Sequence, residues 1–313
     1  MISSRSAPAA FSSHDLELMH HFSTETYLTL TNRQDLKRLW KIVVPQEAFG
    51  HEFLMRGILA ISALHLSYLR PQHKETYLFT ALSHQNMALK LVRSAMQEIT
   101  RANCNAVFAF SSLVVVFAFA SPHFEESLIL VKQSEEPAEW VNLIRGVRTI
   151  LKPTWDWIRN GTLGLLVRDG LDVTSAAASE ETVARLGRIQ RLCEDTSDGY
   201  EAKESYTEAM MQLRACFIDT GPAETEERQL AIAFVWPAIV PETYISMLRK
   251  KRPEALIILA HYCIILHLVD DYWWMKGRAF YLVKNVQSML EDPWRRWIEW
   301  PASVVGLEEK EMT

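Results

Sequence analysis

The chain lacks the cysteine and glycine patterns that mark several common kinds of functional site. Its four cysteines, Cys104, Cys193, Cys216 and Cys263, stand far apart among 313 residues, with no Cys-x-x-Cys pair. This spacing argues against a zinc cluster and against a disulfide framework, so we expect four buried, reduced thiols. No Gly-x-Ser-x-Gly, Gly-x-Gly-x-x-Gly or P-loop motif occurs. Hydrolase and nucleotide-dependent functions therefore have no support in the sequence.

An excess of basic residues is also absent. Lysine and arginine number 33 against 38 aspartates and glutamates, which gives a net charge of −5. No run of four or more basic residues offers the electrostatic footprint that binding to a phosphate backbone requires. We therefore expect no direct nucleic-acid binding by this chain.

Long uninterrupted hydrophobic runs are missing as well. The longest apolar stretches, 107–120 and 255–269, fall short of the roughly 20 residues that span a bilayer. The amino-terminal residues 1–10 lack the apolar core of a signal peptide. We expect buried helices and no membrane span.

Helical periodicity is what the sequence does contain. Glycine is sparse, with 11 residues, and apolar and polar residues do not alternate as they do in strands. We expect an all-α fold of about ten to twelve helices in one domain over residues 14–305, between a disordered leader, 1–13, and a tail, 306–313. The main helices are expected at 51–69, 77–100, 105–120, 138–151, 206–217, 241–249, 253–269 and 273–290. Residues 169–198 are expected to form a long surface connection, with one amphipathic helix at 181–193.

The most informative segment is 270–276, Asp-Asp-Tyr-Trp-Trp-Met-Lys, which follows the apolar run 254–269. On one buried helix, two carboxylates, two indoles and a lysine would form a pocket floor that carries both signs of charge. This segment is the first place where we look for function.

Six phrases of the sequence resemble the regulatory domain of fungal-specific transcription factors of the sterol-uptake-regulator type. They are Leu16–Phe22, Phe53–Leu66, Arg145–Val147, Arg252–Tyr262, Tyr272–Met275 and Trp294–Pro301. The resemblance implies an all-helical domain around an apolar ligand pocket, which the sterol-uptake regulators use to sense ergosterol. The family's Zn₂Cys₆ cluster and basic linker are missing here, so we expect a ligand domain without its own DNA-binding module.

Two departures from that family pattern add a cation near apolar helices. Arg56 stands where the family usually has histidine, and Arg278 stands where it usually has tryptophan. Extra cations suit a diphosphate better than a sterol. A second, weaker resemblance is to the humulene synthases of fungal tropolone-sesquiterpenoid pathways, which bind farnesyl diphosphate through a magnesium cluster and an essential lysine.

These departures favour a Mg²⁺-dependent sesquiterpene cyclase, a lyase of secondary metabolism that ionises farnesyl diphosphate. Asp270 and Asp271 would be catalytic and hold the metal, and Lys276 would take up charge on the leaving group. Cation–π contacts and charge from the surrounding side chains would bind the substrate. The substrate-binding residues expected are Arg56, Tyr272, Trp273, Trp274 and Arg278, with His267 orienting Asp271.

Each of these residues also has a structural interpretation. The aspartates fit a solvated turn, the tryptophans fit core packing, Lys276 fits a surface position, and His267 fits a satisfied core histidine. The alternative function is a fungal transcriptional regulator with a sterol- or lipid-sensing domain. The expected partner is a prenyl diphosphate or another lipophilic small molecule, with a homodimer left open. The cyclase would be cytoplasmic and the regulator nuclear.

Overall fold

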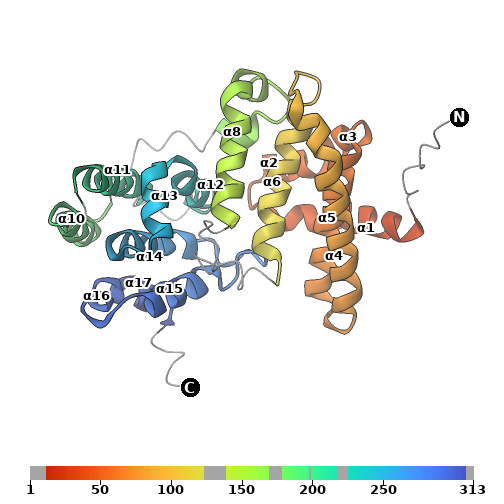
Figure 1. Ribbon diagram of the computed structural model, residues 1–313. Helices are drawn as coiled ribbons and strands as arrows, with labels where there is room; N and C mark the ends of the chain where they lie inside the picture. Colours follow the sequence, from red (N-terminus) through yellow and green to blue (C-terminus); the bar gives the residue numbers. More distant parts are fainter. Residues whose placement is uncertain (1–11, 123–138, 169–177, 197–198, 218–224, 308–313) are drawn as a thin grey trace, which may run out of the picture. The chain divides into compact units, whose positions relative to one another are not determined.

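Helices make up every regular element in the computed structural model, which describes residues 12–122, 139–168, 178–196, 199–217 and 225–307 (Figure 1). These residues contain no strand, so the all-α prediction is confirmed. The chain divides into two compact units, Met1–Leu113 and Val114–Thr313. The domain limits expected from the sequence stay predictions. The expected leader and tail fall mainly on residues 1–11 and 308–313, which lie outside the described residues.

The first unit is built around a hairpin of two long helices, α4 and α5. Its helices are α1 (Ser13–Thr24), α2 (Gln34–Arg38), α3 (Val44–Phe49), α4 (Glu52–Leu69), α5 (Lys74–Gln97) and the beginning of α6 (Cys104–Ala120). Nearly every residue of α4 is buried, because the helix is apolar on all sides and α1, α3 and α5 pack around it. Ser12 starts α1 with a capping box, in which its hydroxyl accepts from the Asp15 N–H and the Asp15 carboxylate accepts from the Ser12 N–H.

A glycine allows close packing within this unit. A Cβ atom added at Gly57 would lie 2.8 Å from Cδ2 of Phe110, whose own ring is 2% exposed. Phe110 also packs edge-to-face against Phe53, with ring centroids 5.7 Å apart and an interplanar angle of 78°. The missing side chain of Gly57 is therefore part of how the ring of Phe110 fits against α4.

The second unit surrounds α14, whose residues Glu254–Leu266 are all buried. Its helices are α8 (Glu139–Arg159), α9 (Leu165–Arg168), α10 (Glu180–Glu194), α11 (Tyr200–Cys216), α12 (Thr225–Ile239), α13 (Glu242–Arg249), α14 (Pro253–His267), α15 (Arg278–Met289), α16 (Asp292–Arg295) and α17 (Glu299–Val304). Helices α10, α11, α12, α13, α15 and α17 all contact α14. Because α14 has neighbours on every side, it needs no polar face.

Aromatic side chains fix α12 against α14. Trp236 stacks on Tyr262 with ring centroids 4.7 Å apart, and its indole N–H donates to the Ala209 carbonyl at 3.0 Å. The Tyr262 hydroxyl donates to the Ala233 carbonyl at 2.6 Å. Both polar ends are satisfied, so the two rings are buried without an unpaired donor.

Several helix boundaries differ from the sequence expectation, and one helix was not expected. Helix α8 continues through Pro153 to Arg159, since Thr154 and Ile158 are buried one turn apart beyond the proline. Helix α11 begins at Tyr200 rather than at 206, and α15 begins at Arg278 rather than at 273. Helix α12 was not expected at all. Its apolar residues follow no single stripe, because several of its faces are covered.

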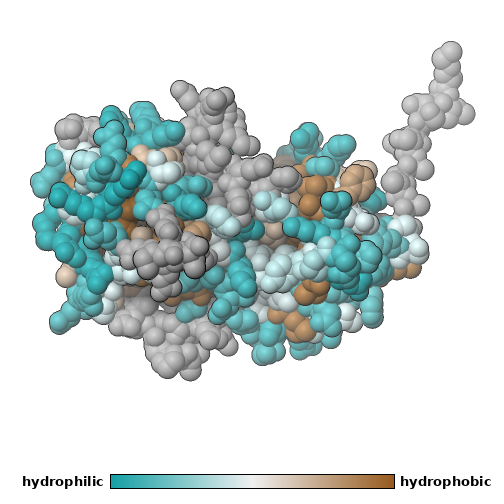
Figure 2. Space-filling model, turned by 90° about the horizontal axis from the view of Figure 1, so that it is seen from below, coloured by the Kyte–Doolittle hydropathy of each residue, from teal (hydrophilic) through white to brown (hydrophobic). Residues whose placement is uncertain are grey.

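The structure also bears on the expectations for the cysteines and for membrane-spanning helices. All four cysteines are free and buried, as expected. Helix α4 is long and apolar enough to cross a membrane, as is the pair formed by residues 229–239 and α13 if its 84° bend is ignored. However, 78% of the α4 window is buried in the structure, which is typical of a core helix and compatible with no span. On the face shown in Figure 2, hydrophobic residues form only small, separated patches.

Candidate functional site

The segment expected to carry the chemistry, residues 270–276, is a series of turns and not part of a helix. Helix α14 ends at His267, and α15 begins only at Arg278. Backbone hydrogen bonds spanning three residues, such as Tyr272 N–H to the Val269 carbonyl at 3.2 Å, replace the helical pattern. Gly277 closes the segment with φ of 76°, a left-handed conformation that favours glycine. The expectation of one continuous buried helix is therefore wrong.

The two aspartates of this segment have different surroundings. Asp270 is half-buried, and its Oδ1 accepts the Gly277 N–H at 2.7 Å. Asp271 and Lys276 are exposed. Within the described ranges, no three His, Cys, Asp or Glu residues are placed to hold a metal ion. The metal role of the two aspartates, and Mg²⁺ itself, stay untested predictions.

The aromatic residues of the segment pack into the second unit. Trp274 is 2% exposed and stacks on Phe234, with centroids 6.0 Å apart and an interplanar angle of 13°. Phe119 meets the Trp274 ring edge-on at 6.4 Å, and Tyr272 lies 5.8 Å away. Trp273 is only half-buried. The indole nitrogen of Trp274 is buried and has no hydrogen-bond partner among the residues that the structure describes, which is an uncommon state for a tryptophan.

The three remaining candidates, Arg278, His267 and Arg56, differ in their surroundings. Arg278 is half-buried, and its Nη2 lies 3.4 Å from the Ser121 carbonyl oxygen. His267 is half-buried, and no hydrogen bond or ion pair joins it to Asp271 in the described part of the chain. Arg56 lies in the first unit and is 6% exposed. Its guanidinium Nη2 pairs with Glu52 at 3.1 Å, which accounts for a buried cation on an apolar helix.

Buried and half-buried histidines form a polar network in the first unit, to which the sequence analysis assigned no role. His65 Nδ1 lies 3.2 Å from Nε2 of His21 and 3.1 Å from the Thr26 hydroxyl. Burial, and secondly the neighbouring His21, lowers the pKa of His65 to about 4. His84 Nε2 lies 3.0 Å from the Asp15 carboxylate, yet burial still lowers the pKa of His84. These histidines join α1 and α5 to the buried helix α4.

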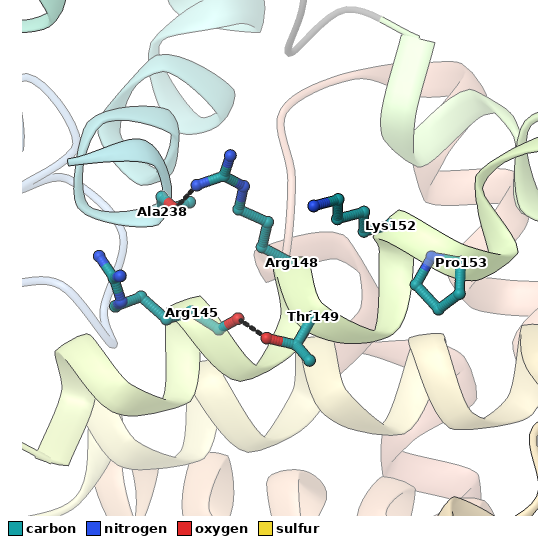
Figure 3. Close-up of a pocket in the computed structure, with 6 residues that line it drawn as sticks. All are labelled: Arg145, Arg148, Thr149, Lys152, Pro153 and Ala238. Atoms are coloured by element: carbon teal, nitrogen blue, oxygen red, sulfur yellow. Dashed lines mark hydrogen bonds between the residues drawn. The ribbon is translucent and has the colours of Figure 1, made fainter. Parts of the chain in front are cut away.

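A cavity of about 690 Å³ opens between α8 and α12 in the second unit. Three cationic side chains of α8, Arg145, Arg148 and Lys152, line it together with Thr149 and Pro153, and α12 contributes Ala238 (Figure 3). Sequence reasoning did not select this site. Its signal is the spacing of the three cations at i, i+3 and i+7, which places them on one helix face.

Comparison with known proteins identifies relatives of one kind. Residues 17–156 match the model of the fungal specific transcription factor domain. The chain is 26% identical, over 94% of its length, to a Zn(2)-C6 fungal-type transcription factor of Gibberella zeae, and it spans 62% of that protein. It is 24% identical over 88% of its length to sterol uptake control protein 2 of Saccharomyces cerevisiae, of which it spans 30%.

A third relative is the Zn(2)-C6 fungal-type transcription factor afumD of Aspergillus fumigatus. The two proteins are 27% identical over 83% of this chain, and the chain spans 69% of afumD. Two of these relatives are named as transcription factors and one as a sterol uptake control protein, and none of the three is named as a terpene cyclase. The expectation of a sesquiterpene cyclase, with its assignment as a magnesium-dependent lyase of secondary metabolism, is therefore wrong. A prenyl diphosphate partner has no support, and the cytoplasmic location is not confirmed.

The added cations misled the sequence interpretation, since Arg56 is already paired inside the first unit and Lys276 points to solvent. The first resemblance is confirmed: the chain is a relative of fungal Zn(2)-C6 transcription factors and sterol uptake control proteins, and its residues 17–156 match the fungal specific transcription factor domain.

Proposed function

We propose that this chain is the regulatory domain of a fungal transcriptional regulator that acts in the nucleus and responds to a sterol or a related lipid. The observation that carries the proposal is the similarity to Zn(2)-C6 transcription factors and to sterol uptake control protein 2 over 83–94% of the chain. The net charge of −5 provides no basic footprint for a phosphate backbone. DNA contact would therefore come from a separate domain or a partner protein.

The aromatic cluster around Trp274 supports a lipid with one hydroxyl group as the ligand. Phe234 and Phe119 flank the indole, and the indole N–H is buried without an acceptor in the described part of the chain. A sterol is an apolar body that carries a single hydroxyl oxygen. Its oxygen would accept the orphaned N–H, while its rings would pack against the aromatic side chains. Binding would require the cluster to open around the ligand.

A transcriptional readout tests the regulatory role. The full chain is fused to a heterologous DNA-binding domain in yeast cells that carry a matching reporter gene. Lowering cellular sterol should change reporter expression several-fold in the fusion, and should leave the DNA-binding domain alone unchanged. A fusion that neither activates nor represses the reporter at any sterol level would overturn the proposal.

Direct binding tests the ligand. Purified chain is titrated with ergosterol in detergent, and bound radiolabelled sterol is measured. Trp274→Phe keeps an aromatic ring but removes the N–H donor, so we expect about fivefold weaker binding, the effect of one neutral hydrogen bond. Trp294→Phe, at a half-buried position outside the cluster, is the matched control. Equal affinity in the two variants would exclude the Trp274 cluster as the sterol site.

A further inference from the structure

We propose that the cavity between α8 and α12 binds a phosphate group, either of a small free metabolite or of a lipid headgroup. The three cationic residues that line the cavity carry the proposal, and it does not depend on the sterol response proposed above. The site would give the protein a second effector, chemically distinct from a sterol.

The cations lie close together on one face of α8. Arg145, Arg148 and Lys152 project on the side of the helix that faces Ala238 of α12 (Figure 3). Like charges at i, i+3 and i, i+4 on a helix repel one another and destabilise it. A bound anion would reverse this repulsion, so the ligand should stabilise the folded protein.

Many hydrogen-bond donors at the cavity remain available. Arg148 Nη1 donates to the Ala238 carbonyl at 2.8 Å, which uses one of the five N–H donors of its guanidinium. Lys152 is exposed, and its ammonium makes no hydrogen bond or ion pair with any residue that the structure describes. A guanidinium fork beside a mobile ammonium is a combination that suits phosphate oxygens.

The two arginines also have a structural role, which Lys152 does not share. Arg145 donates to the Val240 carbonyl at 2.7 Å and Arg148 to the Ala238 carbonyl, so both satisfy carbonyls at the carboxyl end of α12. Binding these two carbonyls explains why α8 carries Arg145 and Arg148. It does not explain why Lys152 lies one turn further along the same face of the helix.

The described residues that line the cavity carry positive charge only. None of its six lining residues is acidic. The nearby acid, Glu242, already pairs with Arg145 at 2.7 Å and with Arg249 at 3.3 Å, and its side chain is 64% exposed. The local charge is therefore positive although the whole chain is negative. This positive charge would attract an anion from solution most strongly at low ionic strength.

The cavity also has the dimensions of a ligand site. Its volume of about 690 Å³ falls within the range of roughly 300–1,000 Å³ that is usual for small-molecule pockets. Pro153 and Ala238 supply apolar wall, and Thr149 adds a hydroxyl that already donates to the Arg145 carbonyl at 3.0 Å. A ligand with a phosphate group and a compact organic part would fit this cavity, because its phosphate would contact the cations and its organic part would contact Pro153 and Ala238.

Binding is tested with the full chain in two arms. In the first, inorganic phosphate is titrated at low ionic strength, and heat and melting temperature are recorded. In the second, the chain is sedimented with vesicles of phosphatidylcholine that contain or lack phosphatidic acid. Lys152→Gln should weaken the binding of phosphate, or of vesicles that contain phosphatidic acid, about tenfold or more, since it removes one charge-assisted contact. Lys152→Arg should keep most of the affinity.

The matched control is Lys284→Gln on α15, which removes the same charge from an exposed lysine of the same unit. Saturable phosphate binding that Lys152→Gln weakens and Lys284→Gln does not would support a free anion as the ligand. The same pattern with phosphatidic acid vesicles alone would support a headgroup. No saturable binding in either arm, or an equal loss of binding in both glutamine variants, would overturn the proposal. Neither outcome would bear on the sterol response, which the reporter experiment tests separately.

Discussion

The Asp270 carboxylate accepts the backbone N–H of Gly277 at 2.7 Å and so joins the two ends of the turn segment between α14 and α15. Its neighbour Asp271 is exposed on the same segment. Two adjacent carboxylates that look equivalent in the sequence therefore have separate roles. One holds the loop that turns the Trp274 ring into the core, and the other faces solvent.

Removing the Asp270 carboxylate should destabilise the protein more than removing that of Asp271. Asp270→Ala leaves the Gly277 N–H without its charged acceptor, so we expect a loss of about 1–2 kcal/mol in the free energy of unfolding. Asp271→Ala is the matched control and should stay within about 0.5 kcal/mol of the parent chain. Urea denaturation followed by tryptophan fluorescence measures both. Equal effects from the two variants would contradict the assigned role of Asp270.

The close approach of Gly57 to Phe110 predicts that even a methyl group at this position is harmful. In Gly57→Ala the new Cβ would lie 2.8 Å from the Phe110 ring, and the buried ring has little room to move. We expect a loss of about 1–3 kcal/mol through overpacking, despite the better helix propensity of alanine.

The control for Gly57 is Gly187→Ala on α10, where nothing lies within 4 Å of the added Cβ. This change should stabilise the chain by up to about 1 kcal/mol. Thermal unfolding by circular dichroism compares the two variants. A Gly57→Ala protein as stable as Gly187→Ala would show that the packing around Phe110 is not as tight as the distance implies.

Stability should fall on acidification because of the buried histidines. Burial lowers the pKa of His65 and of His261 to about 4 each, from the usual 6.5. The unfolded chain therefore binds protons on these groups below pH 6.5, whereas the folded chain does so only near pH 4. Each histidine should remove about 1.4 kcal/mol of unfolding free energy for every pH unit between these values.

Urea denaturation from pH 7.5 to 4.5 measures this slope. His65→Gln removes one titrating group, so its slope should be shallower than that of the parent chain, whatever its stability at neutral pH. His20→Gln, at an exposed position, should leave the slope unchanged. A His65→Gln slope identical to that of the parent would mean that His65 is readily protonated in the folded state.

The buried contact between Thr196 and Glu254 predicts a cost for removing the hydroxyl alone. The Thr196 Oγ1 donates to Oε1 of Glu254 at 2.6 Å, and both residues are buried. In Thr196→Val the carboxylate loses this donor, so we expect about 1–3 kcal/mol of destabilisation. Thr24→Val, at an exposed threonine of α1, should have almost no effect in the same denaturation experiment. If both changes were neutral, water would have to replace the lost donor.

Much of the helical architecture was predictable, because long apolar runs have few ways to be satisfied. The runs behind α6 and α14 are too apolar for a surface and too short for a bilayer, so burial among other helices is the remaining outcome. The run behind α4 is long enough to span a bilayer, and its burial in the structure is typical of a core helix. The resemblance to fungal transcription factors was likewise visible in phrases such as Tyr272–Met275. Helix α12 escaped prediction because contacts on several of its faces erase any single apolar stripe.

The candidate site was less predictable, since the sequence shows which charges are present but not which ones are already paired. It placed Arg56, Asp270 and Lys276 in one imagined pocket, whereas the structure pairs Arg56 with Glu52, turns Asp270 toward Gly277 and exposes Lys276. The cavity at Arg145, Arg148 and Lys152 received no attention, although its helical spacing was visible. A cation becomes a candidate ligand only after its other partners have been counted.

Fold class and kinship can therefore be read from the amino-acid sequence, because the burial of apolar residues and the shared phrases depend on composition and residue order. The partners of each polar side chain, in contrast, depend on how the chain folds. Those partners come from residues distant in the chain, as Thr196 does for Glu254, and a hydrogen bond depends on separations of a few tenths of an ångström. Local sequence carries no record of such distances.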